Sequence, residues 1–558
     1  ADGNTAVGRD SLVANTTGAS NTAVGGTALD ANTTASFNTG LGYAALGANT
    51  TGAYNTAVGE STLVANTTAS SNTAVGNFAL GSNTTGATNT AVGRAALDAN
   101  TTANENTAVG YASLGANTTG AKNTAVGRTA METNTTGASN TAVGSDALTA
   151  NTEGSSNTAF GQEAAKAITT GGENVAIGHG ALDGGTTCEG NVAIGTDAMG
   201  GVVAGQGYNV AVGYNAMLVS TSASGTTAIG NQCLDALTTG NNNTGVGAGA
   251  LGLNTTGATN VAVGWSALDA NTTGHYLTAV GAGALGANTT ANSNTGVGEN
   301  ALSNLTTGAG NTATGGACMD QGVVTGNNNT AVGHLAARYV SSGAGNTAVG
   351  GGAGDSVTTG SNNSFLGLDT GYNLTTGSAN VYVGYNNTAS AVGVDNELLI
   401  GSNANGGGTN TARFQTSGGS ATLGLDGSDT SWAAASDSRL KKDVATSAVG
   451  LDFIKDLRPI TFKWNAKNAI ANNLPQYDAS SSDPVHGSGK TQHGFLAQEV
   501  KTAIDEHSGL KDGFTMWRED PDGTQQVAPT ALVPMLVKAV QELSAKVEEL
   551  ETKLNNKE

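Results

Sequence analysis

The polar and apolar positions of this chain repeat with a period of seventeen residues. The phrase Asn-Thr-Ala-Val-Gly, with variants such as Asn-Val-Ala-Ile-Gly, begins at Asn4 and recurs to give 24 copies, the last at Asn396. Only three of the steps differ from seventeen, each by one residue. A fixed period of this length is typical of solenoid proteins, in which one repeat forms one coil. Residues 1–400 are therefore predicted to form a repetitive β-solenoid shaft.

Each position of the unit, approximately NTAVGxxALxANTTGAx, has a predicted role. The phrase alternates as a short strand does, with Val7 on one face and Ala6 on the other, and we expect the valine to pack in the core. The closing glycine, such as Gly8, suits a bend with positive φ. Leu12 supplies the second large apolar side chain, and the side chains of Asn-Thr-Thr-Gly are expected to cap backbone groups in a turn.

One valine and one leucine per coil make a thin core, which predicts that the coils need partners. The middle alanine of the phrase, as in Ala57, is almost never larger until Phe365 and Tyr382, so we expect this face to meet another chain at close range. Three copies about a common axis would explain the pattern. At roughly 4.8 Å per coil the shaft would be on the order of 115 Å long.

The composition excludes several classes of function. Charged residues make up only 11% of the chain, against roughly 25% in an average globular domain. The net charge of −20 disfavours nucleic acid and anionic membrane surfaces as partners, and leaves a neutral glycan or a protein surface. Three distant cysteines and the absence of a metal-binding motif predict no cofactor and no metal, and no apolar run is long enough for membrane insertion.

The Asn-Thr-Thr triplets have two readings. They match the acceptor pattern for N-glycosylation, but in a regular repeat we expect turn chemistry to be the reason for them. A flat rank of threonines for binding ice is disfavoured, because adjacent threonines such as Thr16 and Thr17 point to alternate sides.

The phrase at Asn174 and Asn191 resembles the head repeat of trimeric autotransporter adhesins, a parallel β-roll shared by three chains. Similar repeats occur in phage tail fibres, so the C-terminal part of the chain has to distinguish them. From residue 431 onward the repeat is gone, and charges, Pro and Trp appear. Residues 401–430, which contain three consecutive glycines, are predicted to be a transition.

Four motifs occur in order after this transition: SDSRLKKDV, LDFIKDLRPITFKW, HGFLAQEV and ALVPMLVKAVQEL. Together they resemble the self-cleaving intramolecular chaperone domain of phage tail fibres, tail spikes and endosialidases. The resemblance covers nearly all of residues 431–558. It implies a small α+β domain that folds as a homotrimer, aligns the shaft and then cleaves the chain at its own N-terminal edge.

The resemblance also implies the catalytic residues. It makes Ser436 the nucleophile and Lys441 the general base, with Ala435–Ser436 as the scissile bond. Ser438 is a rival nucleophile, since it lies one helical turn from Lys441. His493 is a candidate for assisting proton transfer, or it only lines the fold. Without the resemblance, the Ser-Asp pair would be read as a helix N-cap followed by an exposed polar face.

The last helix carries evidence of its own for association. Its apolar residues are spaced four, three, four, three and four apart, which predicts a coiled coil over residues 535–556. Val and Leu at the two seam positions favour two strands by themselves, so the trimer rests on the shaft and on the resemblance. The seam residues are Leu536, Val540, Leu543, Val547, Leu550 and Leu554.

The sequence thus predicts a homotrimeric tail fibre on a bacteriophage virion, which binds a host cell-surface glycan or protein receptor. Its only chemistry would be a single-turnover self-cleavage by a serine endopeptidase with no external substrate. The alternative is a bacterial surface adhesin or extracellular filament that uses the same chaperone. A glycan-cleaving enzyme is disfavoured, because acidic residues such as Asp30 and Glu60 are scattered and form no carboxylate pair.

Overall fold

The chain folds into two units. A computed structural model describes residues 2–557, apart from residues 203, 204, 206, 418, 426–432, 435–441, 473, 475, 487, 488, 511–513 and 520–523. The first unit is Ala1–Ala435 and the second is Ser436–Glu558. None of the described helices is long and apolar enough to cross a membrane.

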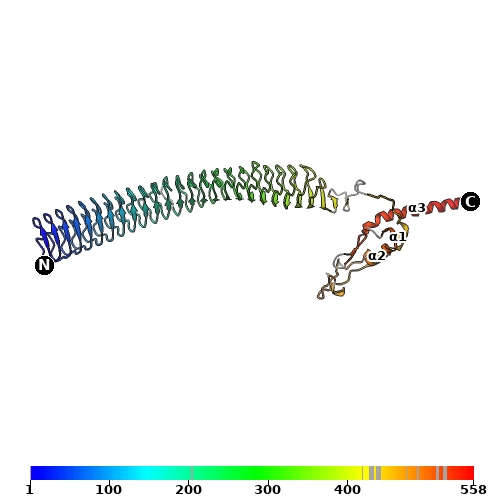
Figure 1. The fold of residues 1–558 in the computed structure, drawn as a ribbon, viewed down its shortest axis with the longest axis horizontal. Coiled ribbons are helices and arrows are strands. Elements are labelled where there is room, and N and C mark those ends of the chain that lie inside the picture. The colour runs from blue at the N-terminus through cyan, green and yellow to red at the C-terminus, as the bar shows by residue number, and fades with distance from the viewer. Residues whose placement is uncertain are drawn as a thin grey trace. The chain divides into compact units, whose positions relative to one another are not determined.

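The first unit is a parallel β-solenoid whose coils are stacked one on the next (Figure 1). Each coil contributes one short strand, and neighbouring strands pair in register, with Thr5 opposite Thr22 and Ala6 opposite Ala23. The predicted fold class, mainly β with about 24 coils, is confirmed. In the described residues these strands are β1 (Thr5–Val7), β2 (Thr22–Val24), β3 (Thr39–Leu41), β4 (Thr56–Val58), β5 (Thr73–Val75), β6 (Thr90–Val92), β7 (Thr107–Val109), β8 (Thr124–Val126), β9 (Thr141–Val143), β10 (Thr158–Phe160), β11 (Val175–Ile177), β12 (Val192–Ile194), β13 (Val210–Val212), β14 (Thr227–Ile229), β15 (Thr244–Val246), β16 (Val261–Val263), β17 (Thr278–Val280), β18 (Thr295–Val297), β19 (Thr312–Thr314), β20 (Thr330–Val332), β21 (Thr347–Val349), β22 (Ser364–Leu366), β23 (Val381–Tyr385) and β24 (Glu397–Ser402).

The prediction that the valine face of each strand lies in the core is wrong, because the alanine face lies there. From Ala23 onward the middle alanine points into the coil and is fully buried, whereas Val7 is 57% exposed and Ile177 is 38% exposed. The reason is the narrow interior: a Cβ at Gly40, which takes the alanine position in β3, would lie only 3.1 Å from a backbone oxygen and 3.4 Å from Leu29 Cγ. Valine has no room there. The expectation that the alanine face meets another chain is therefore wrong, because that face packs inside its own coil.

Two columns of asparagine complete the interior, and both continue from coil to coil. In the Asn-Thr-Thr turn, Asn49 Nδ2 donates to Asn32 Oδ1 at 3.1 Å and to Gly52 O at 3.0 Å. In the second column, Asn38 Oδ1 accepts from the backbone N–H of Asn55 at 2.9 Å. Buried amides that are paired in this way tie neighbouring coils together, and the turn column is interrupted where Ile168 and Leu305 follow Asn151 and Asn288. Since Asn49 is fully buried, its place in the turn explains the triplet, as predicted.

The bends use more left-handed backbone than the glycines alone predict. Gly25 has φ 137°, and a Cβ there would lie 2.3 Å from Gly42 O of the next coil. The same coil also holds Thr27 at φ 54° and the buried Leu29 at φ 53°. A non-glycine residue in this region costs on the order of 1–2 kcal/mol. The strain adds to the thin core as a reason for the shaft to need further stabilisation.

The end of the shaft departs from the repeat. Phe365 and Tyr382 replace the middle alanine, are buried, and stack with ring centroids 5.7 Å apart. Gly371 makes room for them, since a Cβ there would lie 2.4 Å from the Phe365 ring. Beyond β24 the sheet continues with β25 (Thr411–Thr416), parallel to β24, and then with the antiparallel strands β26 (Gly419–Gly424) and β27 (Ala433–Ala434).

The second unit is a small α+β domain. Its core contains Phe453, Val500, Ile504, Met516 and Leu532, all buried. Two short antiparallel hairpins, β28 with β29 and β30 with β31, flank the helices. Its described elements are α1 (Leu451–Asp456), β28 (Ile460–Phe462), η2 (Lys467–Ala469), β29 (Gln492–Gly494), α2 (Ala497–Glu506), η3 (Ser508–Leu510), β30 (Trp517–Glu519), β31 (Gln525–Val527), η4 (Pro529–Leu532) and α3 (Val533–Asn555).

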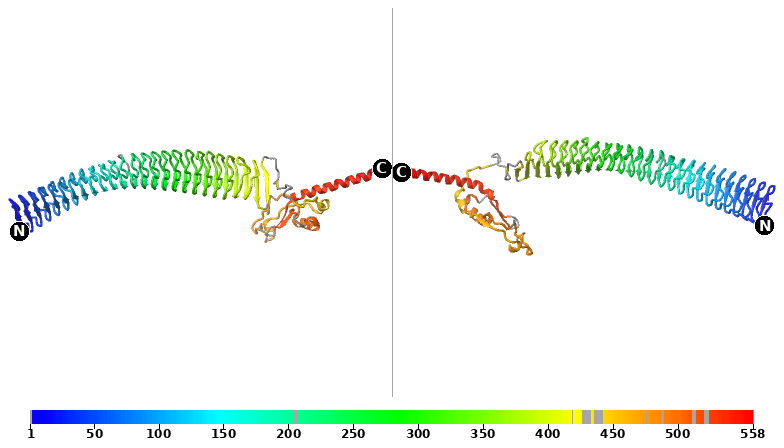
Figure 2. Two further views of the ribbon diagram at one scale, coloured as in Figure 1. Left: turned by 45° about the horizontal axis from the view of Figure 1, so that its top comes forward. Right: turned by 180° about the vertical axis from the view of Figure 1, so that it is seen from behind.

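The predicted C-terminal helix is present as α3, and its C-terminal part extends beyond the rest of the second unit (Figures 1 and 2). The six apolar residues of the predicted seam are exposed in the single chain, from 44% at Leu536 to 66% at Leu554. An exposed apolar stripe of this length is typical of a helix that associates with other helices. The coiled coil itself stays a prediction.

Candidate functional site

The catalytic pair inferred from the resemblance, Ser436 and Lys441, and the rival Ser438 lie outside the described residues. The chain on both sides of them is described. On the N-terminal side, Ala433–Ala434 forms β27, with Ala434 opposite Ala421 of β26. On the C-terminal side the description resumes at Lys442, which is exposed.

His493 lies in the second unit, in the middle of β29. Its partner across the hairpin is Thr461 of β28. The imidazole is exposed and borders a hollow of about 840 Å³ that is also lined by Phe462, Trp464 and His486. The His486 ring meets the edge of Trp464, with centroids 4.7 Å apart. The position leaves His493 open to solvent, as a group that shuttles protons needs to be.

Motifs that are far apart in the sequence meet beside this hairpin. Arg458 belongs to the motif LDFIKDLRPITFKW, and Glu499 belongs to HGFLAQEV. The Nε–H of Arg458 donates a hydrogen bond to Glu499 Oε2 at 3.0 Å. A second ion-pair contact joins Arg458 Nη2 to Glu499 Oε1, so the pair is bidentate. The guanidinium lowers the pKa of the Glu499 carboxyl. This pair and the β28–β29 hairpin together fix the strand that carries His493.

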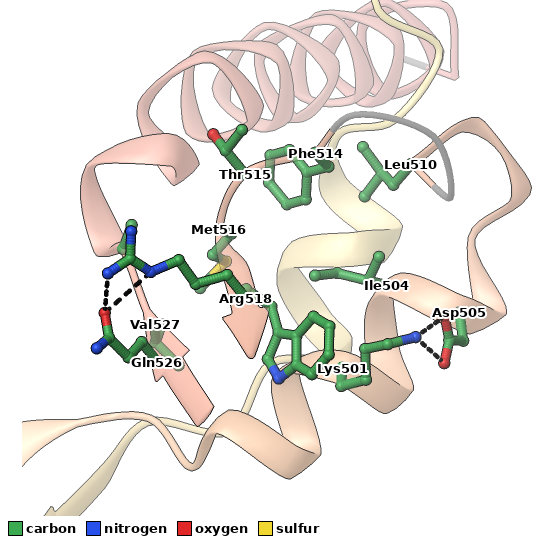
Figure 3. A pocket seen from close by; sticks show the side chains of 12 residues that line it. Lys501, Ile504, Asp505, Leu510, Phe514, Thr515, Met516, Arg518, Gln526 and Val527 are labelled. Atoms are coloured by element: carbon green, nitrogen blue, oxygen red, sulfur yellow. Dashed lines mark hydrogen bonds and ion pairs between the residues drawn. The ribbon is translucent and has the colours of Figure 1, made fainter. Parts of the chain in front are cut away.

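A second hollow, of about 770 Å³, lies against α2 (Figure 3). Its charged groups are already paired: Lys501 binds Asp505, and Arg518 Nη2 donates to Gln526 Oε1 at 2.8 Å. Lys501 also lies 5.2 Å from the centre of the Trp517 ring. Among the described residues, these paired charges over apolar side chains stabilise the fold of the second unit.

The first helix is anchored to the last by a residue that the sequence did not single out. Glu542 Oε2 of α3 accepts a hydrogen bond from the backbone N–H of Leu451, the first residue of α1, at 2.9 Å. The carboxylate thus caps the helix N-terminus and opposes its dipole. Gly450 fits beneath it, since a Cβ there would lie 2.7 Å from Lys538 Cγ. The sequence gives no signal for this role, since α3 carries several glutamates.

A comparison with protein families identifies the second unit. Residues 436–509 match the family model of the chaperone of endosialidase. The endosialidase-type chaperone domain therefore begins at the first residue of the second unit, immediately after the shaft unit ends. A long β-solenoid followed by this domain fits a tail fibre. The domain suggests a chaperone that assists the trimerisation of a fibre and then cleaves itself off. No curated protein matches the chain.

Proposed function

We propose that this protein is the subunit of a homotrimeric bacteriophage tail fibre that is trimmed by its own chaperone domain. The observation that carries the proposal is the match to the chaperone of endosialidase, which starts at Ser436, where the unit that contains the 24-coil solenoid ends. Its place is the virion, and its partner is a neutral glycan or a protein on the host surface. A net charge of −20 disfavours polyanionic receptors.

Self-cleavage takes place at Ala435–Ser436. Neutral Lys441 accepts the Ser436 hydroxyl proton, and Oγ attacks the carbonyl carbon of Ala435, so that the acyl group passes from nitrogen to oxygen as an ester. The proton is returned to the leaving amine. One water then hydrolyses the ester, giving the Ala435 carboxylate and a free Ser436 amine and hydroxyl. His493, exposed on β29, assists proton transfer to this water.

Three copies of the chain pack through the outward face of the shaft strands. In β1–β23 the first and third strand residues point outward, and none of them is charged. The first is Thr, Val or Ser, and the third is Val, Ile, Leu or Phe, with Thr314 as the exception. We call these two columns the Thr–Val stripe. By contrast, the position after the glycine varies freely, with Arg94, Tyr111 and Trp265 among its occupants.

The Thr–Val stripe gives each chain a continuous contact surface. At about 4.8 Å per coil and roughly 3.3 Å per strand residue, it extends about 110 Å by 10 Å, or about 1,100 Å² per chain. In a trimer this area is divided between two neighbours, about 550 Å² each, against about 800 Å² per partner in a standard interface, so the stripe is a modest interface that the chaperone domain has to assist. The residues of the Thr–Val stripe stay uncharged over 23 strands, whereas the position after the glycine varies. Such a difference is expected when the stripe contacts a partner surface that repeats with the same period.

A chaperone solves the register problem that this repetition creates. Each coil is nearly the same as the next, so chains displaced by seventeen residues still match Thr to Thr and Val to Val. The seam of α3 holds three chains at the same residue before the shafts pair. Removal of the domain afterwards makes assembly one-way, because the mature shaft no longer carries the element that aligns it.

The cleavage is tested by the mass of the expressed chain. We expect two fragments from the wild type, ending at Ala435 and beginning at Ser436, and one uncut chain from Ser436→Ala and from Lys441→Ala. Ser438→Ala is the matched control and should cut normally. His493→Ala should cut more slowly and lose part of its pH dependence. An uncut wild type, or a normally cut Ser436→Ala, refutes this chemistry.

The assembly is tested by light scattering on two lysine variants of the same coil. Val75→Lys puts a charge in the Thr–Val stripe, whereas Asn77→Lys puts the same charge two residues on, outside it. We expect a trimer for the wild type and for Asn77→Lys, and weakened or misassembled oligomers for Val75→Lys. A monomeric wild type, or equal behaviour of the two variants, contradicts the proposed packing.

A further inference from the structure

Five aspartates of the shaft lie at the same place in their coils. Each follows the buried leucine, and in each case the residue seventeen positions later, at the same place in the next coil, is glycine. A Cβ added at that glycine would lie 3.3 to 3.8 Å from Oδ1 of the aspartate. The carboxyl group therefore lies against the backbone of the next coil with no side chain between them. We call these the Asp–Gly contacts: Asp30–Gly47, Asp98–Gly115, Asp183–Gly200, Asp235–Gly252 and Asp269–Gly286.

Two of the five aspartates have no charge of opposite sign in their surroundings. Residues 209–293 form five consecutive coils, and Asp235 and Asp269 are their only Asp, Glu, Lys or Arg residues. The other titratable side chains of these coils are Tyr214, Cys233, His275 and Tyr276. Burial, together with the nearby Asp235, raises the pKa of the Cys233 thiol to about 12, so the thiol stays neutral. No cation of the sequence therefore offsets the charge of Asp235 or Asp269.

Charge at these two positions is unfavourable in the folded coil. Both side chains are half-buried, and removal of a carboxylate from water disfavours its charged form. Burial accordingly raises the pKa of Asp235 and of Asp269, and hydrogen bonds from their own backbone N–H and from that of the following alanine offset part of the rise. The folded shaft therefore binds a proton at these carboxyls more tightly than the unfolded chain does.

The following alanine also joins one coil to the next. The Ala236 N–H donates to Gly252 O at 3.2 Å, and the Ala270 N–H donates to Gly286 O at 3.3 Å. The aspartate carboxyl thus shares its donor with a hydrogen bond between coils. A charged carboxylate is a stronger acceptor than a neutral carboxylic acid. Protonation therefore leaves the N–H more fully to the carbonyl oxygen of the next coil.

We propose that the Asp–Gly contacts at Asp235 and Asp269 form a pH-sensitive element of the shaft, in which neighbouring coils hold together more firmly when the two aspartates are protonated. A group whose pKa is raised on folding contributes its full stability below its unfolded value, here 3.8, and loses that contribution as the pH rises through the higher folded value. At neutral pH both aspartates are charged and the element is weakest. Self-cleavage and the Thr–Val stripe involve other residues, so this element acts independently of the proposed function.

The test is amide hydrogen exchange of the full-length chain, followed by mass spectrometry and corrected for the intrinsic rate at each pH. Asp235→Asn replaces the carboxylate with a neutral amide of similar shape, and Glu299→Gln removes one charge at an exposed site. At pH 7 we expect residues 231–252 to exchange about threefold more slowly in Asp235→Asn than in the wild type. Glu299→Gln should leave the exchange of its own coil, residues 294–310, unchanged. At pH 4 the difference between Asp235→Asn and the wild type should become smaller.

The wild type contains an internal control. Val64 and Gly81 stand at the same places in their coils as Asp235 and Gly252, and residues 62–82 carry no charged side chain. Between pH 7 and pH 4 the corrected exchange of the wild type should slow in residues 231–252 but not in residues 62–82. This comparison needs no variant, so it tests the proposal even if Asp235→Asn does not fold.

Asp269→Asn provides an independent check at pH 7, where residues 265–286 should also exchange more slowly. This check is restricted to pH 7, because His275 Nδ1 accepts the Ala258 N–H at 2.9 Å and a protonated imidazole cannot accept it. The proposal is overturned if Asp235→Asn exchanges as fast as the wild type at pH 7, or if its effect is equally large at pH 4. An equal slowing in Glu299→Gln, or an equal acid response in residues 62–82, also overturns it.

Discussion

The asparagine column of the turns should contribute a measurable local stability to each coil. We take Asn83→Ala as the perturbation. Asn83 Nδ2 donates to Asn66 Oδ1 at 3.0 Å and to Gly86 O at 2.9 Å, and Asn83 Oδ1 accepts from Asn100 Nδ2 at 2.9 Å. The residue is fully buried, so alanine removes three hydrogen bonds and leaves Asn66 Oδ1 without its donor.

The expected loss is about 3 kcal/mol, since each buried hydrogen bond contributes about 1 kcal/mol net. In a repeat protein the loss stays in the affected coil and its neighbours, because each coil contacts only those. Amide hydrogen exchange followed by mass spectrometry should therefore show about a hundredfold faster exchange in peptides covering residues 79–101. Peptides several coils away should keep their wild-type rates.

Asn77→Ala in the same coil is the control. The Asn77 side chain donates to Glu60 Oε2 at 3.2 Å, and that hydrogen bond is exposed, so its loss should change exchange by less than threefold. If Asn83→Ala and Asn77→Ala exchange at the same rate, the buried amide column does not stabilise the stack, and the reasoning is refuted. Uniformly faster exchange over the whole shaft would contradict the local character of the coils.

Three further outcomes are expected. Gly25→Ala should open its coil to rapid exchange, because the new Cβ would lie 2.3 Å from a backbone oxygen of the next coil at φ 137°, whereas Gly26→Ala, 3.5 Å from its nearest neighbour, should not. Burial raises the pKa of the Cys233 thiol to about 12, so iodoacetamide at pH 8, where about one such thiol in 10⁴ is ionised, should label it only after unfolding. Tyr382→Phe removes the hydroxyl that donates to Glu397, so amide hydrogen exchange in β24 and β25, followed by mass spectrometry, should become about tenfold faster. Unchanged exchange rates there would show that this hydrogen bond does not stabilise the end of the shaft.

The chaperone domain shows how far ordered motifs can lead. The family could be inferred from four short phrases, and the match to the chaperone of endosialidase over residues 436–509 covers the first three of them. The phrases did not show how they meet in space. That Arg458 of one motif pairs with Glu499 of another, and that Glu542 caps α1, depends on chain reversals between them that no local pattern encodes.

In the shaft, the sequence alone determined the period, the number of coils and the bends at glycine, because each depends on identical residues recurring at a fixed spacing. It could not determine which strand face is inside. Alternation marks two faces without ordering them, and the more apolar Val7 face was assigned to the core. Only the folded coil decides the matter, because beside its buried leucine and asparagines the interior has room for a methyl group at the middle strand position but not for a valine. The valines are left on the outside, where they form the uncharged Thr–Val stripe.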